Sequence, residues 1–244
     1  MTTDKNILEI KKRTLDECGN CFGKGNIPKD GKILVCSCVE KYKKYLEYYK
    51  SGIEEEYWDW EWKDLDKTFL DNNESVISDL KFVIKKPITC IRNKVRFLFL
   101  GKNGIGKNVT SYLLMKDLIK KGFKTQFLVA ETLGNWFFIR DADEREDKFS
   151  RIENCDLVVV DELDKFTGKN EEVLMKLSNY LSELMKEKAI IFISNMNIEE
   201  LKNLGYSNGF INRLEEAEIE EFTGTSFRKS SYSKFKSIRK EYDK

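Results

Sequence analysis

The residues from Gly101 to Lys107, Gly-Lys-Asn-Gly-Ile-Gly-Lys, have the types and spacing needed to hold a phosphate group. Glycines let backbone N–H groups curl around an anion, and the start of a helix adds a favourable dipole. An apolar run from Arg96 to Leu100 precedes this loop, and a helical pattern from Asn108 to Lys121 follows it. In that setting Lys107 is expected to reach the β- and γ-phosphates of a nucleotide. The alternative is a glycine-rich turn with a chance lysine, which the flanking elements disfavour.

The residue after Lys107 departs from the phosphate-loop pattern. It is Asn108, at a position where a Ser or Thr hydroxyl usually ligates Mg²⁺. An amide oxygen can also ligate Mg²⁺, with a different reach, whereas Thr110 and Ser111 point elsewhere on a helix. We therefore expect ATP or ADP to bind with Mg²⁺ and ATP hydrolysis to be weak. The expected nucleotide-contacting residues are Gly101, Asn103, Gly104, Ile105, Gly106, Lys107 and Asn108.

Polar residues follow two later apolar runs that have the length of strands. Asp161 and Glu162 come directly after Leu157 to Val160. In a phosphate-loop ATPase the first carboxylate holds Mg²⁺ and the second polarises the attacking water; plain helix capping and surface charge are the alternative. Asn195 follows the run from Ala189 to Ser194, where it either orients the lytic water or serves as a turn residue.

Four cysteines near the start of the chain form two close pairs. Cys18 and Cys21 are separated by fourteen residues from Cys36 and Cys38. Four thiolates suit a closed tetrahedral Zn²⁺ site, and a segment so poor in apolar residues would gain folding energy from the metal. We therefore predict one zinc ion there. Scattered reduced thiols are the alternative, and that description fits the other two cysteines, Cys90 and Cys155.

The composition limits the chemistry and the class of protein. The chain has no histidine, which removes His-based acid–base catalysis, Ser-His and Cys-His nucleophiles and His-containing metal sites. Its formal net charge is +1, so any affinity for nucleic acid must be local. The longest apolar runs are far too short to span a bilayer, and the first residues carry no signal region. A cytosolic protein with no membrane partner is expected.

Strand-like and helical segments alternate from Arg96 onward, which predicts a parallel sheet covered by helices on both faces. Further helices are expected from Val39 to Lys50 and from Glu171 to Lys186, and a strand from Thr125 to Ala130. We divide the chain into a four-cysteine module, an acidic and aromatic connector with a helix, an ATPase core and a basic tail. Their expected limits are residues 1–50, 51–94, 95–230 and 231–244.

Taken together, the motifs resemble those of AAA+ helicase loaders of the DnaC/DnaI type and of the related IstB transposition ATPases. The resemblance rests on the phosphate loop, on Asp161-Glu162 and Ser194-Asn195, and on the segments Phe210 to Leu214 and Gly224 to Arg228. It implies that Asn195 is sensor 1, that Arg213 is an arginine finger offered to a neighbouring subunit, and that Arg228 is sensor 2. It also implies an AAA+ fold without a full helical lid.

The resemblance implies a function in DNA replication. We expect an ATPase that binds the replicative DNA helicase and single-stranded DNA and that forms homo-oligomers through Arg213. The cysteine module is expected to contact the helicase, with DNA binding by the module as the alternative. Aromatic residues 136–138 and the basic tail could contact DNA; burial of at least two of the aromatics and a solvated basic helix are the alternatives. An IstB-like transposition ATPase and a nucleotide-gated adaptor with little hydrolysis are the alternative functions.

Overall fold

The computed structural model describes residues 4–165 and 171–224. Two compact units divide between Asp59 and Trp60. The expected basic tail, residues 231–244, and Arg228 lie outside the described residues, as does the segment that bears on the presence of a lid. No helix in the described part of the chain is both long and apolar enough to cross a membrane.

The N-terminal unit is built from short elements and one longer helix. A tight turn at Asp30 and Gly31, with φ angles of 50° and 75°, joins β1 to its antiparallel partner β2, as Asp-Gly does in hairpins. The ring of Tyr45 packs on that of Trp58, with centroids 5.0 Å apart. The elements are α1 (Lys5–Lys11), the π-helical turn η1 (Lys12–Asp16), β1 (Asn26–Lys29), β2 (Lys32–Val35), α2 (Ser37–Lys50) and η2 (Glu55–Tyr57).

The second unit has a five-stranded sheet in the order β4-β5-β6-β3-β7, with every neighbouring pair parallel. Its central strands are apolar on both faces, because helices cover both sides. The sheet confirms the predicted α/β class. The strands are β3 (Arg96–Leu100), β4 (Thr125–Val129), β5 (Leu157–Asp161), β6 (Ala189–Ser194) and β7 (Glu218–Glu221).

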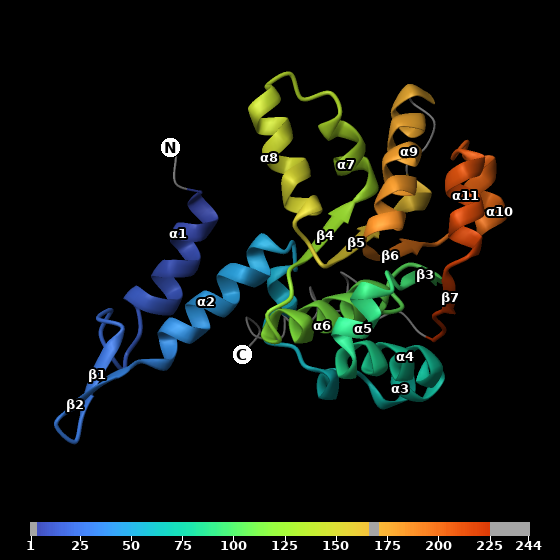
Figure 1. The fold of residues 1–244 in the computed structure, drawn as a ribbon. Helices are drawn as coiled ribbons and strands as arrows, with labels where there is room; N and C mark the ends of the chain where they lie inside the picture. The colour runs from blue at the N-terminus through green and yellow to red at the C-terminus, as the bar shows by residue number, and fades with distance from the viewer. Residues whose placement is uncertain (1–3, 166–170, 225–244) are drawn as a thin grey trace, which may run out of the picture. The chain divides into compact units, whose positions relative to one another are not determined.

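Helices form a layer on each face of this sheet (Figure 1). One layer contains α7 (Ala130–Trp136), α8 (Ala142–Glu153), α9 (Glu171–Glu187), α10 (Ile198–Asn203) and α11 (Asn208–Glu215). The other contains α3 (Lys67–Asn72), α4 (Glu74–Lys85), α5 (Pro87–Arg92) and α6 (Lys107–Lys120). Side chains of β5 alternate between the layers: Val158 and Val160 belong to the core under α9 and α11. The seven elements whose limits were predicted, α2, β3, α6, β4, β5, α9 and β6, each begin and end within two residues of the prediction.

The aromatic segment after β4 is mostly packed into this core. Trp136 and Phe137 lie against the buried cluster and contact the ring of Phe149, at centroid distances of 5.9 and 5.1 Å. Phe138 is 45% exposed. Two of the three aromatics are therefore partly buried against the core, and the acidic residues 143, 144, 146 and 147 that follow them lie in α8.

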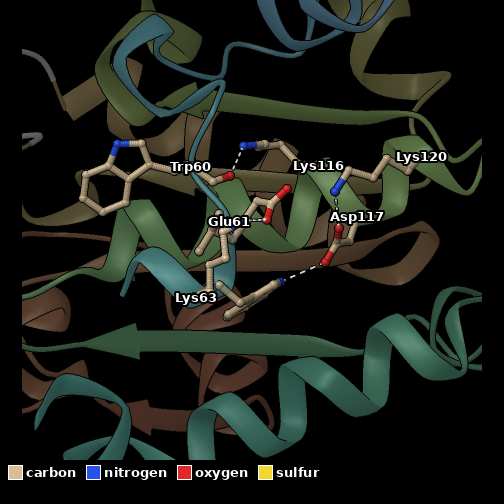
Figure 2. A pocket seen from close by; sticks show the side chains of 8 residues that line it. Trp60, Glu61, Lys63, Lys116, Asp117 and Lys120 are labelled. Atoms are coloured by element: carbon tan, nitrogen blue, oxygen red, sulfur yellow. Dashed lines mark hydrogen bonds and ion pairs between the residues drawn. The ribbon is translucent and has the colours of Figure 1, made fainter. Parts of the chain in front are cut away.

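The chain enters the second unit as a short strap fastened to α6. This strap, residues 60–63, leads into the 3-10 turn η3 (Trp62–Asp64). Lys116 donates to the carbonyl oxygen of Trp60, and the indole nitrogen of Trp62 donates to Oδ2 of Asp117 at 2.8 Å. A pocket of about 340 Å³ is lined by the strap and by α6. Figure 2 shows the side chains that line it. The strap is thus held by the C-terminal half of the helix that follows the phosphate loop.

Candidate nucleotide-binding site

The phosphate loop runs from the end of β3 to the first turn of α6, as predicted. Gly101, Gly104 and Gly106 have φ angles of 139°, 80° and 105°, in the region that favours glycine. A Cβ atom on Gly101 would lie 2.4 Å from Cδ1 of Ile105 and 2.7 Å from the carbonyl oxygen of Phe222. Any side chain at position 101 would therefore displace the loop or the end of β7.

Lys107 begins α6 and is only 5% exposed. Its ammonium group donates to the carbonyl oxygens of Gly101 and Lys102, the latter at 3.0 Å, and to Oδ1 of Asn195 at 3.0 Å. All three acceptors lie at the carboxyl end of the sheet, which is where ligands of open parallel sheets bind. The ammonium is therefore held over the loop by weak, exchangeable partners, and a phosphate group would be a stronger one.

Asn108 and Asp161 meet across the same edge of the sheet. Nδ2 of Asn108 donates to Oδ2 of Asp161 at 2.6 Å, and the backbone N–H of Glu162 donates to Oδ1 at 2.7 Å. Burial raises the pKa of Asp161, and these two hydrogen bonds oppose that rise. In this arrangement the nitrogen of the Asn108 amide faces Asp161, so the amide has to rotate before its oxygen can join Asp161 around Mg²⁺.

Glu162 directly follows β5 with a φ angle of 60°. This left-handed conformation is uncommon for a residue with a side chain. The Glu162 carboxylate is paired with Lys165, one turn further along the chain in η4 (Leu163–Lys165). The structure thus places Glu162 beside the buried Asp161, and it places a lysine next to the carboxylate expected to polarise water.

Asn195 lies next to Lys107, as the predicted role requires, and it has a second partner that sequence reasoning missed. Its side-chain nitrogen donates to Oδ2 of Asp164 at 2.7 Å, and its backbone N–H donates to Oδ1 at 3.0 Å. Asp164 is 8% exposed. The signal available in the sequence was a third carboxylate in Asp161-Glu162-Leu163-Asp164. It was overlooked because only the first two acids have an established pattern of roles.

The Thr and Ser hydroxyl groups of α6 point back into their own helix. Thr110 donates to the carbonyl oxygen of Gly106 at 2.8 Å, and Ser111 donates to that of Lys107 at 3.0 Å. Both residues are fully buried. They do not take the place of the missing hydroxyl at position 108, in agreement with the sequence analysis.

Arg213 lies on α11, and its Nη1 donates to the carbonyl oxygen of Gly209 at 2.9 Å. The contacts described above bring together the phosphate loop, Asn108, Asp161, Asn195 and Asp164, and Arg213 is not among them. A residue offered to a neighbouring subunit has no reason to touch the site of its own chain. Its expected role therefore stays a prediction, as does that of Arg228.

The four cysteines of the N-terminal unit lie together. Their Sγ atoms are all within 4.8 Å of one another, the one such cluster in the described part of the chain. The Cys18–Cys36 and Cys21–Cys38 sulfur pairs are 3.8 and 3.5 Å apart. A tetrahedron of sulfurs about 2.3 Å from zinc has edges of about 3.8 Å. The spacing therefore fits Zn²⁺.

Backbone groups favour the thiolate form of Cys18, whereas burial and the neighbouring cysteines raise the pKa of Cys38. N–H of Gly25 donates to Sγ of Cys21 at 3.3 Å. Backbone N–H groups of Cys21 and Asn20 lower the pKa of the Cys18 thiol to about 7. Cys90 and Cys155 are buried elsewhere, and burial raises the pKa of both thiols.

Solved structures with the same fold come from DNA replication. The match to the DnaC helicase loader covers 70% of this chain and 100% of the loader, with 14% identity and a TM-score of 0.56. DnaI matches 72% over 94% of its own chain, with 18% identity and a TM-score of 0.55. The initiator DnaA, bound to AMPPCP and single-stranded DNA, matches 74% over 57% of its own chain, with 17% identity and a TM-score of 0.50.

These likenesses define the class of fold. The chain has the fold seen in the DnaC and DnaI helicase loaders and in DnaA. The match spans about half of the initiator chains, 51% of a DNA replication initiation factor and 57% of DnaA. No family model and no curated protein matches the sequence.

Proposed function

We propose that the chain is an ATP-dependent helicase loader, which binds the replicative DNA helicase and single-stranded DNA during initiation of replication. The observation that carries the proposal is the meeting of Lys107, Asp161 and Asn195 at one edge of a parallel AAA+ sheet. The match to the whole length of the DnaC helicase loader supports it.

The residues at this edge would divide the work of holding ATP. Glycines of the loop leave backbone N–H groups open to the phosphates. Lys107 would exchange its carbonyl partners for phosphate oxygens and keep its contact with Asn195. Asp161 and the oxygen of Asn108 would hold Mg²⁺, which neutralises charge on the phosphates. Glu162 would orient the attacking water once its pairing with Lys165 is relaxed.

The proposal extends to the N-terminal unit of the chain and to assembly. We assign one zinc ion to Cys18, Cys21, Cys36 and Cys38, where it would hold a small, loop-rich module together for contact with the helicase. Arg213 would complete the nucleotide site of a neighbouring copy, and Arg228 would contact the phosphates within its own. The limits of the four zones expected from sequence belong to this proposal.

The test is capture of a replicative helicase by the full-length chain with ATP, with ADP and without nucleotide. We expect retention to depend on nucleotide in the wild type and to lose that dependence in Lys107→Ala. Lys102→Ala is the matched control, because Lys102 lies in the same loop and is exposed. Equal retention of the helicase by the wild type and Lys107→Ala in all three conditions would contradict an ATP-dependent loader.

One observation favours a second function, that of a nucleotide-gated adaptor that binds ATP and scarcely hydrolyses it. Asn108 ties up an oxygen of Asp161 that would otherwise face Mg²⁺. Tight ATP binding with no phosphate release, even with helicase and single-stranded DNA present, would favour the adaptor over the ATPase.

A further inference from the structure

Asp164 and Asn195 make a two-point contact between elements that are far apart in the sequence. Asp164 lies in η4 and Asn195 directly follows β6. Each carboxylate oxygen of Asp164 accepts one N–H of Asn195: Oδ1 from the backbone at 3.0 Å and Oδ2 from the side chain at 2.7 Å. Such bidentate contacts to a charged group are stronger and more directional than single neutral hydrogen bonds.

The contact decides which end of the Asn195 amide faces the phosphate loop. An ionised carboxylate can only accept hydrogen bonds, so the amide must turn its nitrogen toward Asp164. Its oxygen then points the other way, where it accepts from the ammonium group of Lys107 at 3.0 Å. A positive charge at one end and a negative charge at the other hold the amide in one of its two orientations.

We propose that Asp164 is a positioning residue that fixes Asn195 with its oxygen toward the γ-phosphate position. This inference rests on the proposed nucleotide site and deepens it. An amide oxygen at that position accepts from Lys107 or from a water molecule, and it cannot donate to a phosphate oxygen. Asn195 therefore acts on the γ-phosphate through Lys107 and water. The affinity for ADP, which lacks the γ-phosphate, should not depend on the orientation of the Asn195 amide.

A structural role for Asp164 in holding η4 would look similar in a simple activity assay, so a matched control is needed. Tyr206 provides it, since its hydroxyl donates to the carbonyl oxygen of Leu163 at 3.0 Å. Tyr206→Phe removes a hydrogen bond to the same turn and leaves the carboxylate of Asp164 in place. Asp164→Ala removes both contacts to Asn195, and Asp164→Asn keeps one acceptor oxygen and adds a donor.

The experiment has two readouts on the full chain. The first is the side-chain amide NMR signal of Asn195 in the protein without nucleotide, assigned with Asn195→Ala. The second is the ratio of the affinities for AMPPCP and ADP. In Asp164→Ala we expect the Asn195 signals to shift and the preference for AMPPCP to fall about 5-fold, the effect of one lost hydrogen bond. In Asp164→Asn both the Asn195 signals and the preference for AMPPCP should lie between those of the wild type and Asp164→Ala. In Tyr206→Phe both should match the wild type.

Unchanged Asn195 signals in Asp164→Ala would overturn the inference, and so would the same changes in Tyr206→Phe. Shifted signals with an unchanged preference for AMPPCP would overturn the link to the γ-phosphate. If the wild-type chain binds neither AMPPCP nor ADP, the proposed function fails, and the signals in the free protein still decide whether Asp164 orients Asn195.

Discussion

The side-chain nitrogen of Asn108 donates a 2.6 Å hydrogen bond to Oδ2 of Asp161 and so joins the first turn of α6 to the end of β5. Asp161 is 7% exposed, and a buried carboxylate without donors is costly. The amide at position 108 therefore supports the site in the absence of nucleotide. A Ser or Thr hydroxyl is shorter, and it can be both a donor to the carboxylate and a ligand of Mg²⁺.

Replacing Asn108 by Thr tests this relationship. We expect Asn108→Thr to raise the affinity for ATP in the presence of Mg²⁺ by about 5-fold to 10-fold, because a hydroxyl oxygen becomes available to the ion. Titration of a fluorescent ATP analogue with Mg²⁺ and with EDTA measures the effect. Asn108→Ala is the control, since it removes the same hydrogen bond without adding a ligand. Equal Mg²⁺-dependent affinities for the two variants would show that Mg²⁺ does not depend on position 108.

Removing the ammonium group of Lys107 should abolish nucleotide binding. Lys107→Ala is expected to weaken ATP affinity about 100-fold or more, because a charge-assisted contact to the phosphates is lost in a nearly enclosed position. Calorimetric titration with ATP measures it. Lys102→Ala, in the same loop, should stay within about 3-fold of the wild type. An ATP affinity that is unchanged in Lys107→Ala would place the nucleotide elsewhere.

The purified chain should contain about one zinc ion per molecule, measured by elemental analysis. Chelation should unfold the N-terminal unit, because the cluster of Cys18, Cys21, Cys36 and Cys38 supplies much of the order of that segment. Cys36→Ser should lose the zinc, whereas Cys90→Ser should keep it, since Cys90 is buried in α5 of the second unit. Protein prepared without chelators and free of zinc would rule out the site.

Stability should fall as the pH rises toward neutrality, because of Glu220 in β7. Burial, a hydrogen bond with Asp79 and the charges of Asp79 and Glu218 raise the pKa of Glu220 to about 7. Its ordinary value is 4.5, so between these values the folded chain binds a proton that the unfolded chain lacks. The free energy of unfolding therefore decreases as pH rises from 4.5 to about 7.

Denaturant unfolding at about pH 5, 6 and 8 measures whether the free energy of unfolding falls as the pH rises. Glu220→Gln should flatten the dependence, because a neutral amide does not titrate. Glu221→Gln, one residue along the same strand and exposed, should leave it as in the wild type. If the stability of Glu220→Gln still falls with rising pH as in the wild type, other groups cause the pH dependence.

Much of the fold was predictable from local patterns. The run Leu157 to Val160 is apolar on both faces, which indicates a strand between two layers of helices, and the structure places β5 inside the sheet, between β4 and β6. The phosphate loop was predictable for a similar reason, since glycines at its turns and a lysine at the start of α6 are requirements of backbone geometry.

The side-chain hydrogen bonds around the phosphate loop were not predictable in the same way. Asp164 accepts hydrogen bonds from Asn195 although α9 and β6 lie between them in the sequence, and neither residue's type reveals the pairing. The hydrogen bond between Asn108 and Asp161 likewise depends on the register of β5 beside β6 and on the position of α6. Sequence patterns fix which face of an element is buried, and such contacts depend on how the elements are then packed.

Because the strap of residues 60–63 is held by α6, this helix supports both the phosphate loop and the first residues of the second unit. Trp60 is the first residue of the second unit, and the helix that holds it through Lys116 begins at Lys107. The strap is therefore fixed to the same fourteen-residue helix that carries the ammonium group of the nucleotide site, so the start of the second unit and the phosphate loop share one support.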